Sequence, residues 1–238
     1  MTLKQFEKTL DQQLIKGLDL LGFSSGKKHI YHKSFENGKS GSILIEKTDR
    51  RTKNTWFVSV QILFTHNAIE QLVQEVANEF YNSDSIMNTV AEGLGYLTPE
   101  NQYLTWDFTL GEKESKTQKT MNNLLKTVEE YAIPKMEQLC NDQELLRVMI
   151  NHEIGLQITN RVKAPILQYL MGDQSEAYEL ATSTLNEIRP TPKDTSIAEP
   201  ENYASPEEAF TFFRRDKDPR YYFNYKLFFS SFFSKIES

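Results

Sequence analysis

The sequence predicts an α+β protein: a mostly antiparallel five-stranded sheet backed by helices, with an all-helical carboxy-terminal extension. One reason is that eight of the ten glycines lie in the first half of the chain, and tight turns between strands use glycine whereas long helices avoid it. Apolar side chains also alternate between Trp56 and Phe64, which is typical of a strand with one buried face. From Ser115 onward the apolar period is helical. We therefore expect a sheet domain over residues 1–150 and a helical extension over residues 151–238.

The first helix is predicted to begin at Thr2, because Thr2 and Gln5 have the spacing of a capping box. Gly22 supplies a left-handed residue at which this helix can stop. Its apolar residues recur at intervals of three and four, as an amphipathic helix requires: Leu3, Phe6, Leu10, Leu14, Leu18 and Leu21.

Two strands over residues 28–36 and 41–48 are predicted to flank Asn37-Gly38, a dipeptide that favours a two-residue hairpin turn. The third strand follows, and its alternation predicts one buried face made of Trp56, Val58, Val60, Ile62 and Phe64. Two further strands are expected over residues 87–97 and 103–110, which completes the five-stranded sheet.

Along the chain, helices are predicted before and after the last two strands. Asn67 can cap a helix over residues 68–81 that turns an apolar stripe inward. A second helical stripe begins near Ser115, and Pro134 should kink or interrupt it. A further helix is marked by apolar residues near 145–150.

The carboxy-terminal part is expected to contain a helical pair over residues 163–172 and 174–188. Residues 189–206 carry four of the eight prolines and almost no large apolar side chain, so they are predicted to form a linker.

The last 29 residues, 210–238, hold eight of the fifteen phenylalanines. On a helix, one side would carry Tyr222, Tyr225, Phe229, Phe232, Phe233 and Ile236. Leaving so much aromatic surface in water is costly, so we expect this helix to dock on the helical half of its own chain. Self-association through Phe228 and Phe232 is one alternative. An interfacial membrane contact is a weaker one, because Asp216 and Asp218 oppose anionic lipid.

Composition excludes several classes of protein. The chain has 27 basic and 33 acidic residues, and a net charge of −6 argues against a general nucleic-acid binder. One cysteine excludes a disulfide framework and a cysteine-based zinc cage within one chain. The charged amino terminus shows no signal peptide, and no apolar run approaches the roughly 18 residues of a membrane span. We expect a cytoplasmic protein without a membrane partner.

Motifs that carry chemistry are present only in fragments. The stretch from Gly22 to Gly26 matches G-x-S-x-G, but a nucleophile elbow needs a strand before the serine, and here a helix is predicted. His29 and His32 are three apart on a predicted strand, so they face opposite sides and cannot share a metal ion. We therefore predict no catalytic, cofactor-binding or metal-ligating residue, and no cofactor.

Charge is unevenly distributed along the chain. Residues 1–53 carry 11 Lys and Arg against 6 Asp and Glu, whereas residues 54–112 carry 8 Asp and Glu and no Lys or Arg. The helix predicted within this acidic segment would present an acidic and polar face opposite its apolar stripe, suited to a basic partner. The alternative is an ordinary solvated face whose charge is balanced in space by the amino-terminal lysines. The predicted partner-binding residues are Glu70, Gln74, Glu75, Asn78 and Glu79.

The amino-terminal part also resembles a known family. A first helix ends in Leu21-Gly22-Phe23, Gly26 and a basic pair follow, and later segments read Phe57-Val58-Ser59-Val60, Trp106 and Ile133-Pro134. Over residues 3–150 these features resemble an uncharacterised bacterial family of α+β proteins with a Leu-Gly-Phe signature. Some of its relatives resemble immunity or partner-binding proteins of bacterial toxin systems. The resemblance implies binding and no activity, and it leaves the helical extension without a counterpart.

Together these observations predict a non-enzymatic protein that binds a protein partner, such as a basic toxin, on its acidic face. One alternative is an enzyme or small-ligand binder with a site between the sheet and the extension, lined by His29, Tyr31 or His32. Another is a homodimer held by the terminal aromatic residues.

Overall fold

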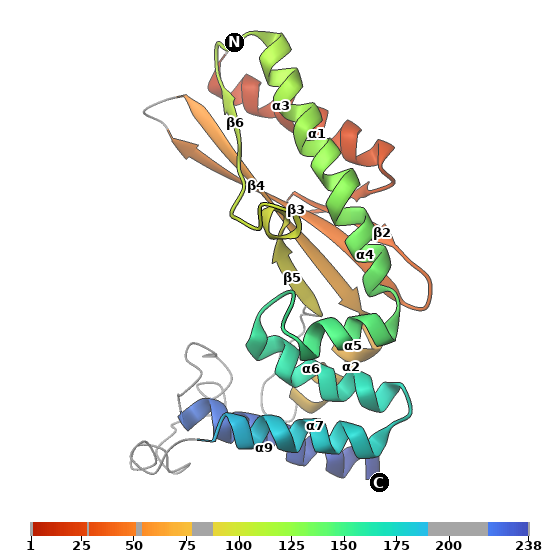
Figure 1. The fold of residues 1–238 in the computed structure, drawn as a ribbon. Coiled ribbons are helices and arrows are strands. Elements are labelled where there is room, and N and C mark those ends of the chain that lie inside the picture. Colours follow the sequence, from red (N-terminus) through yellow and green to blue (C-terminus); the bar gives the residue numbers. More distant parts are fainter. Residues whose placement is uncertain (1, 28, 51–53, 78–87, 190–218, 238) are drawn as a thin grey trace. The chain divides into compact units, whose positions relative to one another are not determined.

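The computed structural model describes residues 2–27, 29–50, 54–77, 88–189 and 219–237 (Figure 1). It divides into two compact units. The chain passes through each unit twice, because the first contains residues 1–65 and 90–145 and the second contains residues 66–89 and 146–238. This division differs from the predicted one, in which residues 1–150 formed one domain.

The first unit contains a sheet and the helices that cover it. Its elements are α1 (Leu3–Leu20), β1 (Ser24–Ser25), β2 (Ile30–Ser34), β3 (Lys39–Arg50), β4 (Thr55–His66, with His66 in the second unit), β5 (Val90–Gly93), η2 (Leu94–Leu97), β6 (Trp106–Thr109), α3 (Glu114–Thr127), η3 (Val128–Ala132) and α4 (Ile133–Leu139). The strand order is β1-β2-β3-β4-β5, and β6 also pairs with β4. The pairs of known register are all antiparallel, which confirms the predicted α+β class. The described sheet has six strands and not the predicted five, because Ser24–Ser25 adds the short strand β1 beside β2.

Helix α1 begins and ends as predicted. Thr2 Oγ1 accepts from Gln5 N at 3.3 Å, and Thr2 N donates to Gln5 Oε1 at 2.8 Å, which completes the capping box. Gly22 adopts φ +84°, a conformation that glycine reaches without strain. A helix and a turn precede Ser24, whereas a nucleophile elbow requires a strand before the serine and a helix after it.

The hairpin of β2 and β3 also follows the prediction. Asn37 and Gly38 have φ values of +57° and +69°, as the two central residues of a type I′ turn require. The resulting register places Tyr31 opposite Ile43, and both side chains are buried.

The central strand β4 buries Val58, Val60, Ile62 and Phe64, whereas Trp56 is half-buried. Strands β5 and β6 pair with different halves of β4. Both are shorter than predicted, and β5 ends where the chain leaves the sheet at Leu94 to form a 3₁₀ turn.

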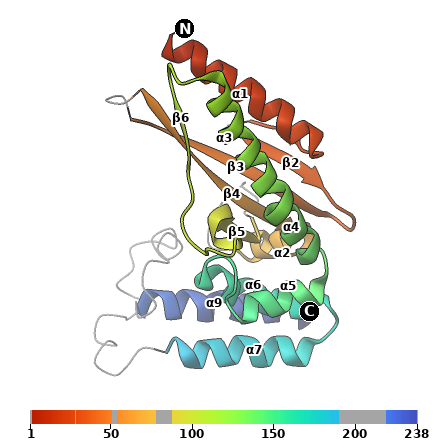
Figure 2. The same ribbon diagram turned by 45° about the horizontal axis from the view of Figure 1, so that its top comes forward.

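The helices of this unit lie along one side of the sheet (Figure 2). Helix α1 approaches α3 closely, because a Cβ atom on Gly17 would lie 2.3 Å from Leu125 Cδ1. Helices α3 and α4 are joined by the π-helical segment η3, which ends just before Pro134. Proline has no N–H to give to the preceding turn, and the wider π turn accommodates this loss, so the predicted interruption is confirmed.

The second unit is helical. It contains α2 (Asn67–Ala77), α6 (Gln157–Leu170), α7 (Gln174–Glu187) and α9 (Pro219–Glu237), while α5 (Asp142–Ile150) spans the division. Helix α2 belongs to this unit because its apolar stripe, including Ile69 and Val76, packs among helices α6 and α9. The predicted linker over residues 189–206 lies, apart from Arg189, outside the described residues. Among the described residues, no helix is long and apolar enough to cross a membrane.

Helix α9 supplies an aromatic core to the second unit. Phe228 and Phe232 are 3% and 1% exposed, and the Phe232 ring meets the edge of Tyr169 with centroids 5.5 Å apart. Tyr225 donates its buried hydroxyl to the carbonyl of Arg161. The expected docking on the chain's own helices is confirmed. Phe228 and Phe232, the residues predicted to mediate self-association, are covered within one chain and offer little surface to a second copy.

Candidate functional site

Two buried lysines in the first unit hold helices to strand β3. Lys47 Nζ lies 2.7 Å from Asp11 and 3.1 Å from Glu7, both on α1. Lys39 Nζ lies 2.6 Å from Asp142 at the start of α5. Each lysine side chain is 5% exposed, and each is satisfied by carboxylates. The two ammonium groups are therefore covered and paired, and they are not available to a partner.

A third buried lysine, Lys163, lies in the second unit. Lys163 Nζ on α6 lies 2.8 Å from Glu70 Oε1 on α2 and donates to the carbonyl of Asn88 at 2.6 Å. The Thr89 hydroxyl donates to the same carboxylate at 2.7 Å and accepts from the backbone N–H of His66. Burial lowers the pKa of Lys163, and the Glu70 carboxylate opposes this shift. The prediction that Glu70 faces a partner is therefore wrong, since its carboxylate is buried and paired.

The rest of the predicted acidic face is small. Gln74 is half-buried and Glu75 is exposed, while Asn78 and Glu79 lie outside the described residues. Lys235 of α9 donates to the Glu75 carbonyl at 3.1 Å, so a basic side chain lies beside this end of α2. Among the described residues, only Glu75 offers the exposed carboxylate expected on this helix.

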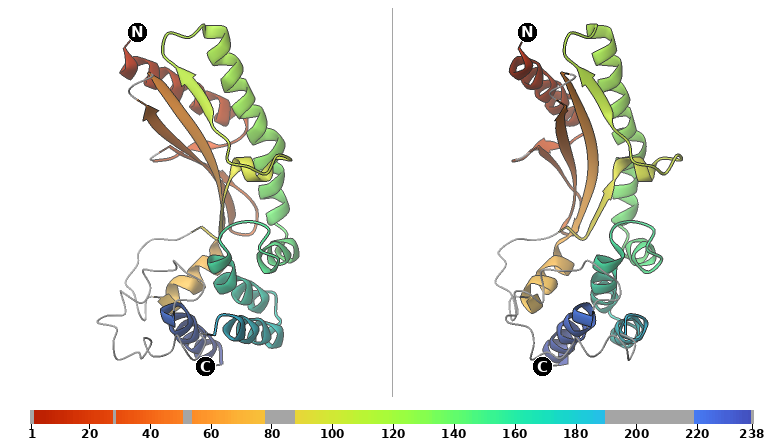
Figure 3. Two further views of the ribbon diagram at one scale, coloured as in Figure 1. Left: turned by 60° about the vertical axis from the view of Figure 1, so that its left-hand side comes forward. Right: turned by 90° about the vertical axis from the view of Figure 1, so that its left-hand side faces the viewer.

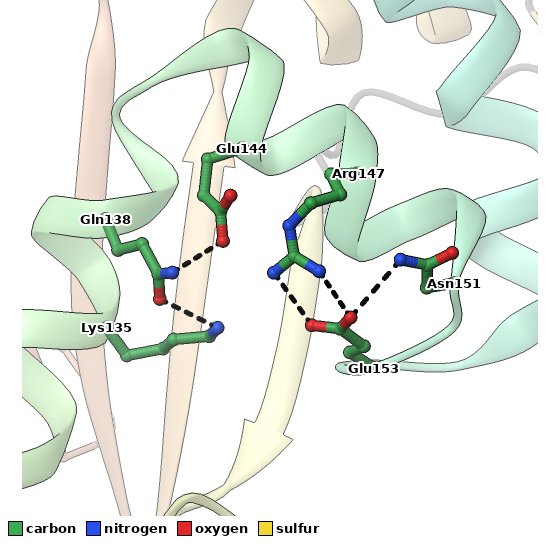
Figure 4. Close-up of polar contacts among 6 residues, drawn as sticks. All are labelled: Lys135, Gln138, Glu144, Arg147, Asn151 and Glu153. Atoms are coloured by element: carbon green, nitrogen blue, oxygen red, sulfur yellow. Dashed lines mark hydrogen bonds and ion pairs between the residues drawn. The ribbon is translucent and has the colours of Figure 1, made fainter.

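Polar residues on α4 and α5 pair locally (Figure 4). In the first unit, Gln138 receives a hydrogen bond from Lys135 at 2.9 Å and donates to Glu144 at 2.5 Å. In the second unit, both terminal nitrogens of Arg147 donate to Glu153, at 2.5 and 2.9 Å. Because acids and bases satisfy one another in both places, neither set forms a surface of one charge.

The residues proposed to line an enzyme site do not converge. Tyr31 is buried, and burial followed by the Asp11 charge raises the pKa of its hydroxyl. His29 and His32 are exposed, and the alternation of β2 directs His32 away from the face that holds Tyr31. His32 Nδ1 lies 2.8 Å from Ser42 Oγ, but no side chain of the described residues binds its other ring nitrogen. A serine nucleophile with an oriented base is not assembled here.

An exposed element that the sequence did not single out connects β5 to β6. We call residues 94–105 the tyrosine loop. Gly95 braces it, because the Gly95 carbonyl accepts from Thr98 N, Thr98 Oγ1 and Gln102 N at 3.4, 2.9 and 3.3 Å. A Cβ atom on Gly95 would lie 2.1 Å from the Gln102 carbonyl oxygen, so only glycine permits this approach. Leu94 is buried at the base of the loop.

The tyrosine loop presents aromatic and acidic side chains to solvent. Tyr96 is 47% exposed and Tyr103 is 67% exposed, and Figure 3 shows the segment standing out from the body of its unit. Glu100 in the loop and Asp107 on β6 are exposed, and the sequence places no Lys or Arg between residues 54 and 112. Tyrosine offers large contact area at low entropic cost, which suits it to protein recognition.

The described residues contain no cluster of three or more His, Cys, Asp or Glu side chains that could hold a metal ion. Comparison of the chain with family models, with curated proteins and with solved structures finds no match. The function of this chain is therefore inferred from its own residues.

Sequence reasoning missed two features. The Lys163–Glu70 pair joins residues 93 positions apart, and no local pattern indicates which lysine meets which acid. The tyrosine loop did leave a signal, since Pro99 and Asn101 lie between the two predicted strands and Gly95 lies near the end of the first.

Proposed function

We propose that this protein is a non-enzymatic binding protein that receives a basic protein partner on the tyrosine loop and the acidic residues beside it. The observation that supports the proposal best is the loop itself: two exposed tyrosines on a backbone braced by Gly95. A preformed loop loses little conformational entropy on binding. For the same contact area it therefore binds more tightly than a loop that must become ordered on binding. The surrounding carboxylates steer association toward cationic partners.

The specific role that we propose is that of an immunity-type partner of a basic bacterial toxin, acting in the cytoplasm. The resemblance to the Leu-Gly-Phe family supports this role, and one cysteine in 238 residues is suited to a reducing compartment. We assign the acidic binding surface to the tyrosine loop and not to the predicted face of α2, because Glu70 on α2 is buried.

The test uses capture of protein partners by the tagged full-length chain from the native extract. The double variant Tyr96→Ala/Tyr103→Ala removes both exposed rings and should lose the captured partner. Tyr178→Ala is the matched control, because Tyr178 is 57% exposed but lies in the second unit. Capture that falls equally in both variants, or in neither, would contradict a role for the loop.

Charge is tested separately. Glu100→Lys should slow association with the captured partner and weaken its dependence on salt, since exposed carboxylates act chiefly on the association rate. Glu75→Lys on α2 tests the helix face originally predicted. If Glu75→Lys slows association more than Glu100→Lys does, the binding surface lies on α2 and not on the tyrosine loop.

A further inference from the structure

Within the described residues, strand β6 has one backbone edge that pairs with no other strand. Leu110 N donates to the Asn54 carbonyl at 2.9 Å, which sets the alternation of the β4–β6 ladder. In the observed register Trp106 and Phe108 then exchange hydrogen bonds with β4, whereas Asp107 lies in a pair that is not hydrogen-bonded. The N–H and C=O of Asp107 therefore point away from β4.

Nothing in the described part of the chain pairs with this edge. The strand order ends at β6 on this side, and no backbone group of the described residues binds the N–H or C=O of Asp107. The Asp107 side chain is exposed. Residues 103–112 contain no lysine or proline to block the addition of a strand, and β6 is guarded only by its shortness and by the single charge of Asp107.

We propose that the β6 edge accepts an extended, lysine- or arginine-bearing segment of the partner as an added strand. This inference rests on the proposed function and states how the partner is held: by main-chain hydrogen bonds to Asp107 and by its charge. Charge decides between a basic partner and a second copy of this chain. Antiparallel pairing of two copies about a twofold axis at Asp107, the residue with the free N–H and C=O, would place the two Asp107 carboxylates opposite each other, and like charges directly opposite are destabilising.

The experiment measures binding of three blocked hexapeptides to the full chain at low salt. The basic probe is Lys-Val-Lys-Val-Lys-Val, the acidic control is Glu-Val-Glu-Val-Glu-Val, and the third probe is the basic peptide N-methylated at every residue. Methylation removes the main-chain donors and keeps the charge. We expect only the unmethylated basic peptide to bind, because strand addition needs both the donors and the charge.

Variants at Asp107 separate the two contributions. Asp107→Asn keeps the backbone N–H and should weaken binding about fivefold, as expected for one exposed ion pair. Asp107→Pro removes an N–H that β4 does not use, so β6 should stay paired while binding falls about fivefold further. The methylated peptide is tested on the unmodified protein, so the conclusion does not depend on the folding of the proline variant.

The outcomes are distinguishable. Equal binding of the methylated and unmethylated peptides overturns strand addition, and so does a complete lack of peptide binding. In either case the proposed function still stands or falls on partner capture by the Tyr96/Tyr103 variant. A dimer of the full chain in sedimentation that Asp107→Pro dissociates would assign the edge to a second copy and overturn the basic partner.

Discussion

Lys163 Nζ lies 2.8 Å from Glu70 Oε1, with the two side chains 2% and 1% exposed. This contact joins α6 to α2 and, through Asn88 and Thr89, fixes the segment that leads into β5. Glu70 Oε2 has no hydrogen-bond partner among the described residues, so the carboxylate depends on Lys163 and Thr89 alone. Its position explains why an acidic residue of α2 is structural and not part of a recognition surface.

Removing one member of this pair should strongly destabilise the chain. Glu70→Gln keeps the side-chain shape but leaves the Lys163 ammonium buried without a counter-ion, and we expect a loss of about 3–5 kcal/mol in the free energy of unfolding. The double variant Glu70→Leu/Lys163→Met removes both charges and should lose much less. Urea denaturation of the three proteins measures the difference, and a double variant that is no more stable than Glu70→Gln would contradict the coupling.

Alkaline pH should act on Tyr31. Burial raises the pKa of its hydroxyl above the ordinary value of 10.0, so the folded chain keeps the Tyr31 proton where the unfolded chain loses it. The stability that this group contributes is present below pH 10.0 and falls as the pH rises toward the folded pKa. Tyr31→Phe has no proton to lose, so between pH 9.5 and 11 its unfolding free energy should decline less steeply than that of the unmodified chain. Parallel curves would refute the prediction.

Gly95 should control the tyrosine loop without touching its tyrosines. In Gly95→Ala the new methyl group would collide with the Gln102 carbonyl, so the brace should open at a cost of about 1–3 kcal/mol. Hydrogen exchange at the amides of Thr98 and Gln102 should accelerate. Gly93→Ala is the control, because its Cβ would meet only the movable edge of the Tyr96 ring, at 3.1 Å. Unchanged exchange in Gly95→Ala would show that the brace does not order the loop.

The terminal aromatic residues should affect folding and not association. Phe232→Ala is expected to destabilise the second unit by about 3–5 kcal/mol, because it removes a buried ring that packs on Tyr169. Leu227→Ala changes an exposed residue of the same helix and should have little effect. Thermal unfolding compares the two variants, and sedimentation should show the same mass for both. A change of oligomeric state in Phe232→Ala alone would restore the self-association hypothesis.

Much of the first unit could be predicted from local patterns. The capping box at Thr2, the left-handed Gly22 and the turn at Asn37-Gly38 are decided by residues within a few positions of one another. Pro134 interrupts its helix for an equally local reason, the missing N–H. The predicted strand over residues 87–97 is longer than β5. The tight turn at Gly95 that ends β5 depends on contacts with Gln102 and Leu104 as well as on its immediate neighbours.

The sequence alone determined the α+β class, the order of the elements and the acidic character of residues 54–112. Only the tertiary structure decided which of those acids face solvent, because an amphipathic pattern locates the apolar stripe but not every neighbour that covers the polar face. Lys163 buries Glu70 from 93 positions away, whereas Tyr96 and Tyr103 stay exposed because a braced backbone holds them outward. Tertiary packing decides which residues far apart in the sequence come into contact, and local periodicity does not indicate it.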